Sequence, residues 1–139
     1  MKRTKQVLII RKDLNMRKGK IAAQASHASN AILTNILIGY PFSWFKLPFR
    51  VLSFFYYFAF STPFRDWLIG SFTKACVYVE SEAELLRYYD LAKESGLFAS
   101  KIQDSGRTEF HGVPTWTAVA IGPGYVEEID KITGHLTLY

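Results

Sequence analysis

Residues 6–37 read QVLIIRKDLNMRKGKIAAQASHASNAILTNIL, and this stretch predicts a short buried strand followed by a long helix. The strand, residues 6–11, is apolar and β-branched between polar flanks. The helix, residues 20–37, follows a charged turn. Its apolar residues recur at helical spacing, at Ile21, Ala25, Ala28, Ile32 and Ile36. Because Ala22, Ala25 and Ala28 are small, we expect this helix to pack closely on a sheet.

Further elements follow along the chain. Residues 73–79 predict a second strand. Ser81 and Glu84 then have the spacing of a capping box, which opens a helix that runs to about residue 95 and ends at Gly96. Two more strands are expected at residues 99–103 and 116–121. Pro123-Gly124 then leads into a short helix over residues 126–132, closed by Gly134, and residues 135–139 look extended. This order predicts an α/β fold, a three-layer α/β/α domain around a mixed four-stranded sheet.

Length and composition fit one domain over residues 1–139. Hydrophobic residues make up 49% of the chain and charged residues 21%, enough apolar material for a core. The single cysteine, Cys76, lies in an apolar run and is expected to be a buried, inert thiol in a reducing compartment. We find no secretory signal and expect a cytoplasmic protein. No ligand spacing for zinc or iron–sulfur chemistry is present, and nothing indicates a cofactor.

Basic residues gather near the N-terminus. The first twenty residues contain Asp13 as their one acidic residue, against Lys2, Arg3, Lys5, Arg11, Lys12, Arg17, Lys18 and Lys20. Such clustering suits a polyanion, either nucleic acid or an anionic membrane surface. A solvated face is the alternative, and for Lys2, Arg3 and Lys5 it is at least as good an explanation.

Residues 40–72 form an aromatic-rich segment punctuated by Pro41, Pro48 and Pro63. Residues 51–60 are apolar on all sides. A bilayer-spanning helix needs roughly 20 apolar residues, and Pro63, Arg65 and Asp66 end the apolar run before it reaches that length. We interpret the segment as a helical insertion packed over the domain or into a dimer partner. The alternative is an element that docks on a membrane surface or on a partner protein.

Two segments carry polar residues suited to chemistry. On the first helix Lys20, Gln24 and His27 share one face, and Lys18, Gly19 and Lys20 lie at the helix start, where free N–H groups favour an anion. The second segment, residues 103–109, places Asp104 where a strand enters a glycine turn, with Arg107 and Thr108 nearby and Thr117 in the next strand. Spacing alone leaves ordinary roles open: a packing histidine at His27, a turn aspartate at Asp104 and a strand threonine at Thr117.

The combination of these segments closely resembles the type II peptidyl-tRNA hydrolase family. Residues 7–28 resemble the opening signature of that family, residues 102–109 its Asp-x-Gly-x-Thr loop, and residues 121–123 with 129–136 its closing motif. The match covers about residues 5–38 and 73–139 in the right order. Residues 40–72 are longer and more aromatic than usual. The loop at residues 110–114 is about one residue longer than in many relatives, so the second family threonine falls on Thr117 or Thr115.

The resemblance implies hydrolysis of the ester between a peptide, or an N-blocked aminoacyl group, and tRNA, by a homodimer. Its functional residues fall on Lys20, Asp104, Thr108 and Thr117. We expect Asp104 to orient or deprotonate the attacking water and Lys20 to stabilise the oxyanion or hold the terminal phosphate. The expected substrate-binding residues are Arg17, Lys18, Gln24, His27 and Arg107. Two alternatives remain: an inactive tRNA-binding or membrane-associated adaptor on the same fold, and a hydrolase of other acyl esters or amides.

Overall fold

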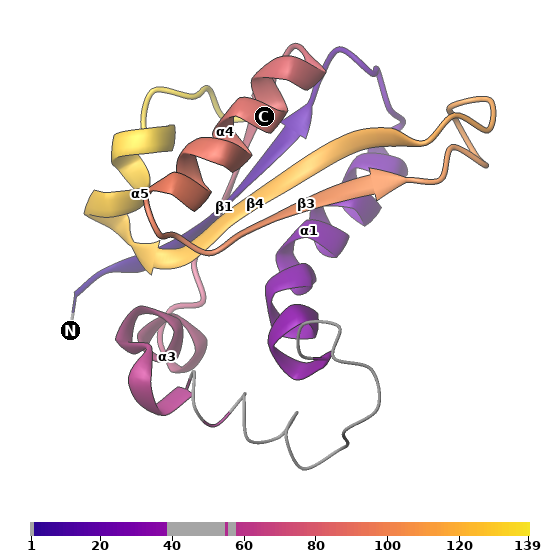
Figure 1. Cartoon of the computed structure of the whole chain (residues 1–139). Coiled ribbons are helices and arrows are strands. Elements are labelled where there is room, and N and C mark those ends of the chain that lie inside the picture. The colour runs from indigo at the N-terminus through magenta and orange to yellow at the C-terminus, as the bar shows by residue number, and fades with distance from the viewer. Residues whose placement is uncertain (1, 39–54, 56–57) are drawn as a thin grey trace.

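A computed structural model of the chain describes residues 2–38, 55 and 58–139. Its centre is a four-stranded sheet in the order β2-β1-β4-β3. The strands are β1 (Thr4–Arg11), β2 (Lys74–Val79), β3 (Ala99–Asp104) and β4 (Thr115–Tyr125). Strand β1 pairs parallel with β2 and antiparallel with β4, and β3 pairs antiparallel with β4, so the sheet is mixed as predicted (Figure 1).

Helices cover both faces of the sheet. They are α1 (Lys18–Ile38), α3 (Thr62–Ile69), α4 (Glu82–Glu94) and α5 (Val126–Thr133). Alternate residues of β1 point to opposite faces. Val7 and Ile9 join Leu85 of α4 and Ile129 of α5 in one buried cluster, while Leu8 and Ile10 join Ala28 of α1 in another. The predicted three-layer α/β/α fold is therefore confirmed.

Helix α1 contacts the sheet through small residues. Ala28 is completely buried, and Ala25 packs beside it against the alanines of β4, Ala118 and Ala120. Small side chains on both surfaces let the helix axis come close to the strands. This close approach carries the first turns of α1 under the carboxyl end of β3, where the polar residues described below meet.

The capping signals around α4 are confirmed with one difference. The Ser81 hydroxyl accepts a hydrogen bond from the Glu84 N–H, but the Glu84 carboxylate accepts from the N–H of Glu80 rather than from that of Ser81. At the other end Gly96 has φ +72°, and the N–H groups of Gly96 and Leu97 donate to Lys93 and Ala92. This is a Schellman motif, in which a left-handed glycine ends the helix.

Strand β4 is longer than predicted. The Pro123-Gly124 pair suggested that the strand ends near residue 121, yet β4 continues to Tyr125. The reason is tertiary pairing, because Gly124 and Tyr125 lie opposite Lys5 and Thr4 at the start of β1. The C-terminal residues add a short bridge on the outer side of β2, with Leu138 opposite Val77.

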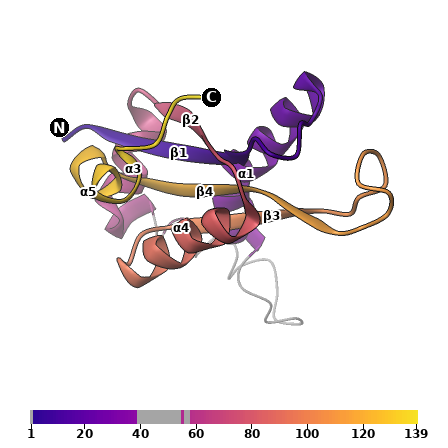
Figure 2. The same ribbon diagram turned by 90° about the horizontal axis from the view of Figure 1, so that it is seen from above.

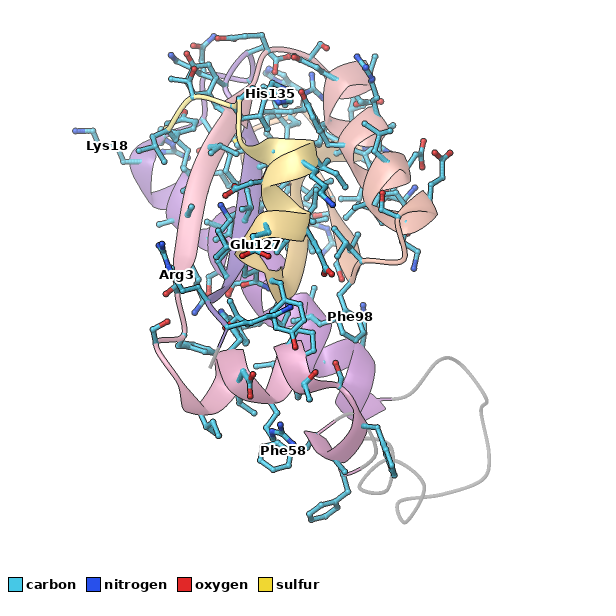
Figure 3. The ribbon with its side chains drawn as sticks, turned by 90° about the vertical axis from the view of Figure 1, so that its left-hand side faces the viewer. Arg3, Lys18, Phe58, Phe98, Glu127 and His135 are labelled. Carbon is cyan, nitrogen blue, oxygen red and sulfur yellow. The ribbon has the colours of Figure 1, made fainter. Side chains whose placement is uncertain are left out.

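Helix α3 lies across one end of the sheet, next to the far end of α1 (Figures 1 and 3). Its Phe64 and Trp67 are fully buried, and Phe64 packs with Ile32 of α1. Residues 40–54 and 56–57 of the predicted aromatic insertion, and with them six of the ten residues 51–60, lie outside the described residues. Within the described part of the chain, no helix has the length and apolar character needed to cross a bilayer.

Cys76 is half-buried rather than fully buried, and it packs beside Leu8 on the α1 side of the sheet. Burial raises the pKa of its thiol. A thiol with a raised pKa is a poor nucleophile at neutral pH, as predicted for an inert cysteine.

Candidate active site

Five polar side chains from four separate segments meet at the carboxyl end of β3. Lys20 and Gln24 lie one turn apart on α1, Asp104 is the last residue of β3, Thr108 belongs to the β3–β4 loop, and Thr117 lies on β4. We call these five residues the Asp104 network. The loop, residues 105–114, extends beyond the sheet at the end opposite α5 (Figures 1 and 2).

The Asp104 carboxylate is held from three directions. Lys20 Nζ donates to Oδ2 in a close ion pair, and Gln24 Nε2 donates to the same oxygen at 3.1 Å. The backbone N–H of Gly106 donates to Oδ1 at 2.9 Å. Lys20 also donates to the hydroxyl of Thr108 at 3.1 Å. Both charged side chains are largely shielded from solvent, with 14% of Lys20 and 13% of Asp104 exposed.

These contacts lower the pKa of Asp104. The Lys20 hydrogen bond is the largest cause, and the Gly106 N–H, the positive charge of Lys20 and the Gln24 amide act in the same direction, while burial opposes them. Asp104 is therefore a carboxylate at neutral pH. Because its proton affinity is low, it is better suited to accept a hydrogen bond from a water than to remove a proton from it.

Gln24 links the carboxylate to the interior of the domain. The Thr117 hydroxyl donates to Gln24 Oε1 and makes a second, longer contact of 3.4 Å with the Ile102 carbonyl. Thr117 is completely buried and Gln24 is 3% exposed. Thr115, the other threonine allowed by the sequence, donates instead to the Val113 carbonyl and takes no part in the network.

The β3–β4 loop is built around Gly106. This residue has φ +79°, and a Cβ placed on it would lie 2.4 Å from the Val113 carbonyl oxygen, so a larger residue does not fit. Its carbonyl accepts hydrogen bonds from the N–H groups of Phe110 and Gly112. The loop thus folds back on Gly106, whose own N–H faces Asp104. The sequence indicated a glycine turn here but not this close backbone contact.

Positive charge surrounds the outer side of the network. Arg17 precedes α1, is 79% exposed on its side chain and donates to Glu109 of the loop at 2.8 Å. Lys18 projects from the start of α1 away from the sheet (Figure 3). Arg107 is exposed and is not among the partners of Asp104. The predicted basic helix start and loop therefore lie side by side, although Lys20 alone of the four basic residues contacts the carboxylate.

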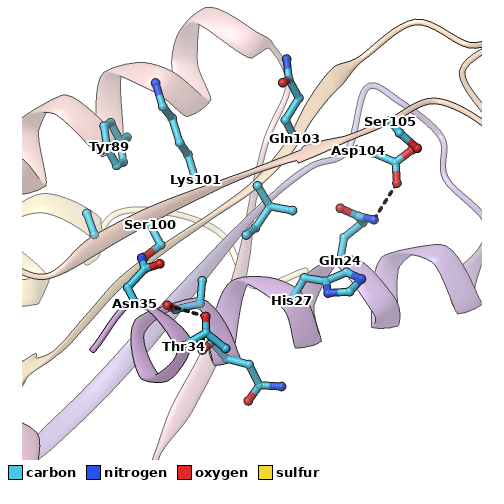
Figure 4. A pocket seen from close by; sticks show the side chains of 14 residues that line it. Gln24, His27, Thr34, Asn35, Tyr89, Ser100, Lys101, Gln103, Asp104 and Ser105 are labelled. Carbon is cyan, nitrogen blue, oxygen red and sulfur yellow. Dashed lines mark hydrogen bonds between the residues drawn. The ribbon is translucent and has the colours of Figure 1, made fainter. Parts of the chain in front are cut away.

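A groove leads away from Asp104 between α1 and β3, with a volume of about 690 Å³ (Figure 4). His27 lines this groove beside Gln24 and is exposed. The same face of α1 continues with Asn30, Ala31, Thr34 and Asn35, and the opposite wall is formed by residues 99–105 and Tyr89. The predicted shared face of Lys20, Gln24 and His27 thus divides: the first two bind Asp104, and His27 faces the groove.

The network has free hydrogen-bonding capacity at its centre. An ammonium group has three donors, and Lys20 uses two of them on Asp104 and Thr108. A carboxylate accepts about four hydrogen bonds, and Asp104 receives three from protein groups. Among the described residues, one N–H donor of Lys20 and one acceptor site of Asp104 are thus left without a protein partner. No cluster of three or more metal-binding side chains occurs in the described residues.

Comparison with known proteins identifies the family. The family model described as "Peptidyl-tRNA hydrolase PTH2" matches residues 4–139, nearly the whole chain. The chain belongs to this peptidyl-tRNA hydrolase family. The Asp104 network falls inside the matched range, as do the loop and the groove.

Relatives in this family come from archaea and animals. A protein of Methanocaldococcus jannaschii named "Peptidyl-tRNA hydrolase" is 40% identical over 134 residues, which are 96% of this chain and 98% of that protein. A protein of the same name from Sulfurisphaera tokodaii is 37% identical over 135 residues, covering 97% and 98%. The mouse protein "Peptidyl-tRNA hydrolase 2, mitochondrial" is 37% identical, and the match covers 97% of this chain and 63% of that protein.

Proposed function

We propose that this chain hydrolyses the ester between a peptide and the terminal ribose of tRNA, with the Asp104 network as its active centre. Membership of the peptidyl-tRNA hydrolase family supports the reaction. The observation that carries the site is the Lys20–Asp104 ion pair, in which each partner keeps hydrogen-bonding capacity that no other described residue uses.

The free groups match the needs of ester hydrolysis. Asp104 accepts a hydrogen bond from a water molecule. This bond orients the water oxygen toward the carbonyl carbon of the ester. As the water attacks, the carbonyl oxygen becomes negative, and the remaining N–H of Lys20 stabilises it. The ester C–O bond then breaks, one proton of the attacking water passes to the ribose oxygen and the other is released to the solvent, and the products are the peptide carboxylate and tRNA with a free ribose hydroxyl. Direct attack by water fits a carboxylate whose hydrogen-bond partners among the described residues are Lys20, Gln24 and the Gly106 N–H, with no serine or cysteine hydrogen bond to it.

The remaining members hold the two charged groups in place. The Thr108 hydroxyl accepts a hydrogen bond from Lys20. This bond limits the directions in which the third N–H of the Lys20 ammonium can point. Gln24 holds Asp104 Oδ2, and Thr117 holds Gln24. In this proposal Thr117 is a positioning residue, because its hydroxyl is buried and reaches the carboxylate only through Gln24.

The basic residues beside the network are proposed to bind the tRNA backbone. Helix α1 has no acidic residue in its first turn but carries Lys18 and Lys20 there. Lysines at this end face the positive pole of the helix dipole, an arrangement that costs about 0.3–1 kcal/mol each in the absence of an anion. A phosphate bound at this end would offset that cost. Arg17, Lys18 and Arg107 are the proposed contacts.

The first experiment is release of an N-acetyl-aminoacyl group from tRNA by the wild type, by Lys20→Ala and by Asp104→Asn. We expect turnover by the wild type and losses of at least about 100-fold in both variants, on the scale of a lost oxyanion contact. Circular dichroism checks that the variants are folded. Full activity in either variant would contradict the role given to that residue. Salt-sensitive tRNA binding without turnover by the wild type would favour the inactive adaptor.

Three features of the assembly are also proposals. We propose that residues 1–139 act as one domain within a homodimer, on the strength of the family resemblance; light scattering tests the oligomeric state.

A cytoplasmic location is supported by the single, half-buried cysteine, and cell fractionation tests it. A membrane or partner surface on the insertion is supported by the exposed side chains of Phe55 and Phe60. Vesicle flotation with and without residues 47–60 tests that surface.

A further inference from the structure

The two outer edges of the sheet differ in how they are covered. The outer edge of β2 pairs with the C-terminal residues, where Tyr78 N–H donates to the Thr137 carbonyl and Tyr139 N–H donates to the Cys76 carbonyl. Strand β3 lies at the other end of the sheet, and no strand of the described chain pairs with its outer side. An open strand edge presents unpaired N–H and C=O groups that bind another extended chain.

The pairing of β3 with β4 tells which groups point outward. The Phe98 carbonyl accepts from the Gly122 N–H at 2.7 Å, and Ser100 and Ile102 continue the same register opposite Ala120 and Ala118. In an antiparallel pair every second residue turns its backbone groups to its partner. The N–H and C=O groups of Ala99 and Lys101 therefore point to the open edge.

This open edge borders the groove that starts at Asp104. Residues from both sides of β3 line the groove: Asn30, Thr34 and Asn35 of α1 on one side, and Tyr89 of α4 on the other (Figure 4). The Lys101 side chain is turned toward the α4 side, with its ammonium 4.9 Å from the Tyr89 ring centre and 4.7 Å from that of Trp116. The Lys101 backbone is thus left facing the groove.

We propose that the groove binds the peptide part of the substrate as an added strand on β3, through main-chain hydrogen bonds to Ala99 and Lys101. This inference rests on the proposed function, and it assigns the peptide to one side of the site. The basic residues Arg17, Lys18 and Arg107 lie on the other side of Asp104, where the tRNA belongs. Among the described residues that line the groove, Lys101 and His27 are the basic ones.

The chemistry fixes the direction of the added strand. The ester is at the C-terminal residue of the peptide, so that residue lies at Asp104 and the preceding residues extend toward Ala99. Strand β3 also runs from Ala99 to Asp104, so the peptide lies parallel to it. At about 3.3 Å per residue, the six residues of β3 accommodate a peptide of roughly five or six residues. Main-chain binding of this kind accepts many sequences, which suits a substrate whose peptide varies.

The experiment compares substrates that differ only in their peptides. The wild type is assayed on tRNA carrying an N-acetyl-aminoacyl group and on tRNA carrying an N-acetyl pentapeptide with the same C-terminal residue. Two or three added main-chain hydrogen bonds predict a kcat/KM roughly tenfold higher for the pentapeptide. Single N-methylation at successive peptide amides then removes one N–H at a time. We expect losses at alternate positions, because alternate residues of a strand face the same neighbour.

A steric variant tests the same inference from the protein side. Thr34→Trp places a large side chain in the groove from an exposed position of α1, and Ala22→Trp places one on α1 outside the groove as its control. We expect Thr34→Trp to lower the pentapeptide-to-aminoacyl ratio of kcat/KM to about one, and Ala22→Trp to keep the wild-type ratio.

The outcomes separate the two proposals. Equal kcat/KM for the two wild-type substrates, or N-methylation losses without alternation, would overturn the peptide groove while the hydrolase stands. An unchanged ratio in Thr34→Trp would also overturn it. Release of neither substrate would overturn the proposed function, and the groove with it.

Discussion

Thr117 and Gln24 are joined by a hydrogen bond that is buried within the domain and decides the orientation of the Gln24 amide. The Thr117 hydroxyl donates to Gln24 Oε1, so Gln24 Nε2 is turned toward Asp104 Oδ2 at 3.1 Å. With the amide reversed, its oxygen would face the carboxylate and repel it. In the proposed mechanism Thr117 therefore acts on Asp104 only through Gln24, from a fully buried position.

Removal of this hydroxyl should reduce turnover without unfolding the protein. Thr117→Val keeps the side-chain shape but leaves Gln24 Oε1 buried without its donor, a loss of about 1–3 kcal/mol. We expect kcat to fall roughly tenfold or more with little change in KM. Steady-state kinetics on N-acetyl-aminoacyl-tRNA measures both constants. Thr117→Ser should restore most of the activity, and Thr115→Val is the control, since that hydroxyl bonds only to the Val113 carbonyl. Equal kcat in Thr117→Val and the wild type would contradict the positioning role.

The loop glycine Gly106 offers a test with a matched control. Gly106→Ala adds a Cβ at φ +79° and 2.4 Å from the Val113 carbonyl oxygen, whereas Gly112 has φ +80° and open space around its Cβ position. Both substitutions carry the left-handed strain of about 1–2 kcal/mol, but only the first pushes the loop away from Asp104. We expect kcat/KM to fall at least roughly tenfold in Gly106→Ala and much less in Gly112→Ala. Similar losses in both would show that backbone strain alone matters.

The sequence predicts the features that depend on neighbouring residues better than those that depend on contacts between distant residues. The local sequence pattern was sufficient to predict β1, α1 and α4. The spacing of apolar residues indicates β1 and α1, and Ser81 and Gly96 mark the two ends of α4, so each signal depends only on residues close in sequence. It failed at Pro123-Gly124, which resembles a turn but is held in β4 by pairing with Lys5. The same limit applies to the site. Lys20 and Gln24 share a helix face by spacing, but the bond from Gln24 to Thr117 joins residues 93 apart, and no local pattern encodes it.

The lowered pKa of Asp104 predicts how acid affects stability. A carboxyl group with a lower pKa in the folded state stabilises the fold at pH values above its unfolded pKa, near 3.8, and this contribution is lost as the pH falls through the folded value. We therefore expect the free energy of unfolding of the wild type to fall below about pH 4 more steeply than that of Asp104→Asn. Urea unfolding between pH 2.5 and about 7 measures this difference. Parallel curves for the two proteins would show that Asp104 is not stabilised as a carboxylate.

The basic residues beside the network should contribute unequally to tRNA binding. Lys18 and Arg107 are exposed, and no ion pair of either is found in the described residues, whereas Arg17 is paired with Glu109. Each phosphate contact that is lost reduces the slope of log affinity against log salt by about 0.7–0.9. We expect such a reduction for Lys18→Gln and Arg107→Gln, and a smaller one for Arg17→Gln because Glu109 already offsets that charge.

Glu109→Gln extends this test in the opposite direction. It releases Arg17 from its partner, so tRNA affinity should rise at low salt and the salt slope should become steeper by up to about one unit. Titration of fluorescent tRNA from low to moderate salt measures both quantities, with Lys93→Gln on the far helix α4 as the control. An unchanged slope in Lys18→Gln and Arg107→Gln would place the tRNA elsewhere. A weaker affinity in Glu109→Gln would mean that the Arg17–Glu109 pair holds the loop in place rather than restraining Arg17 from a phosphate.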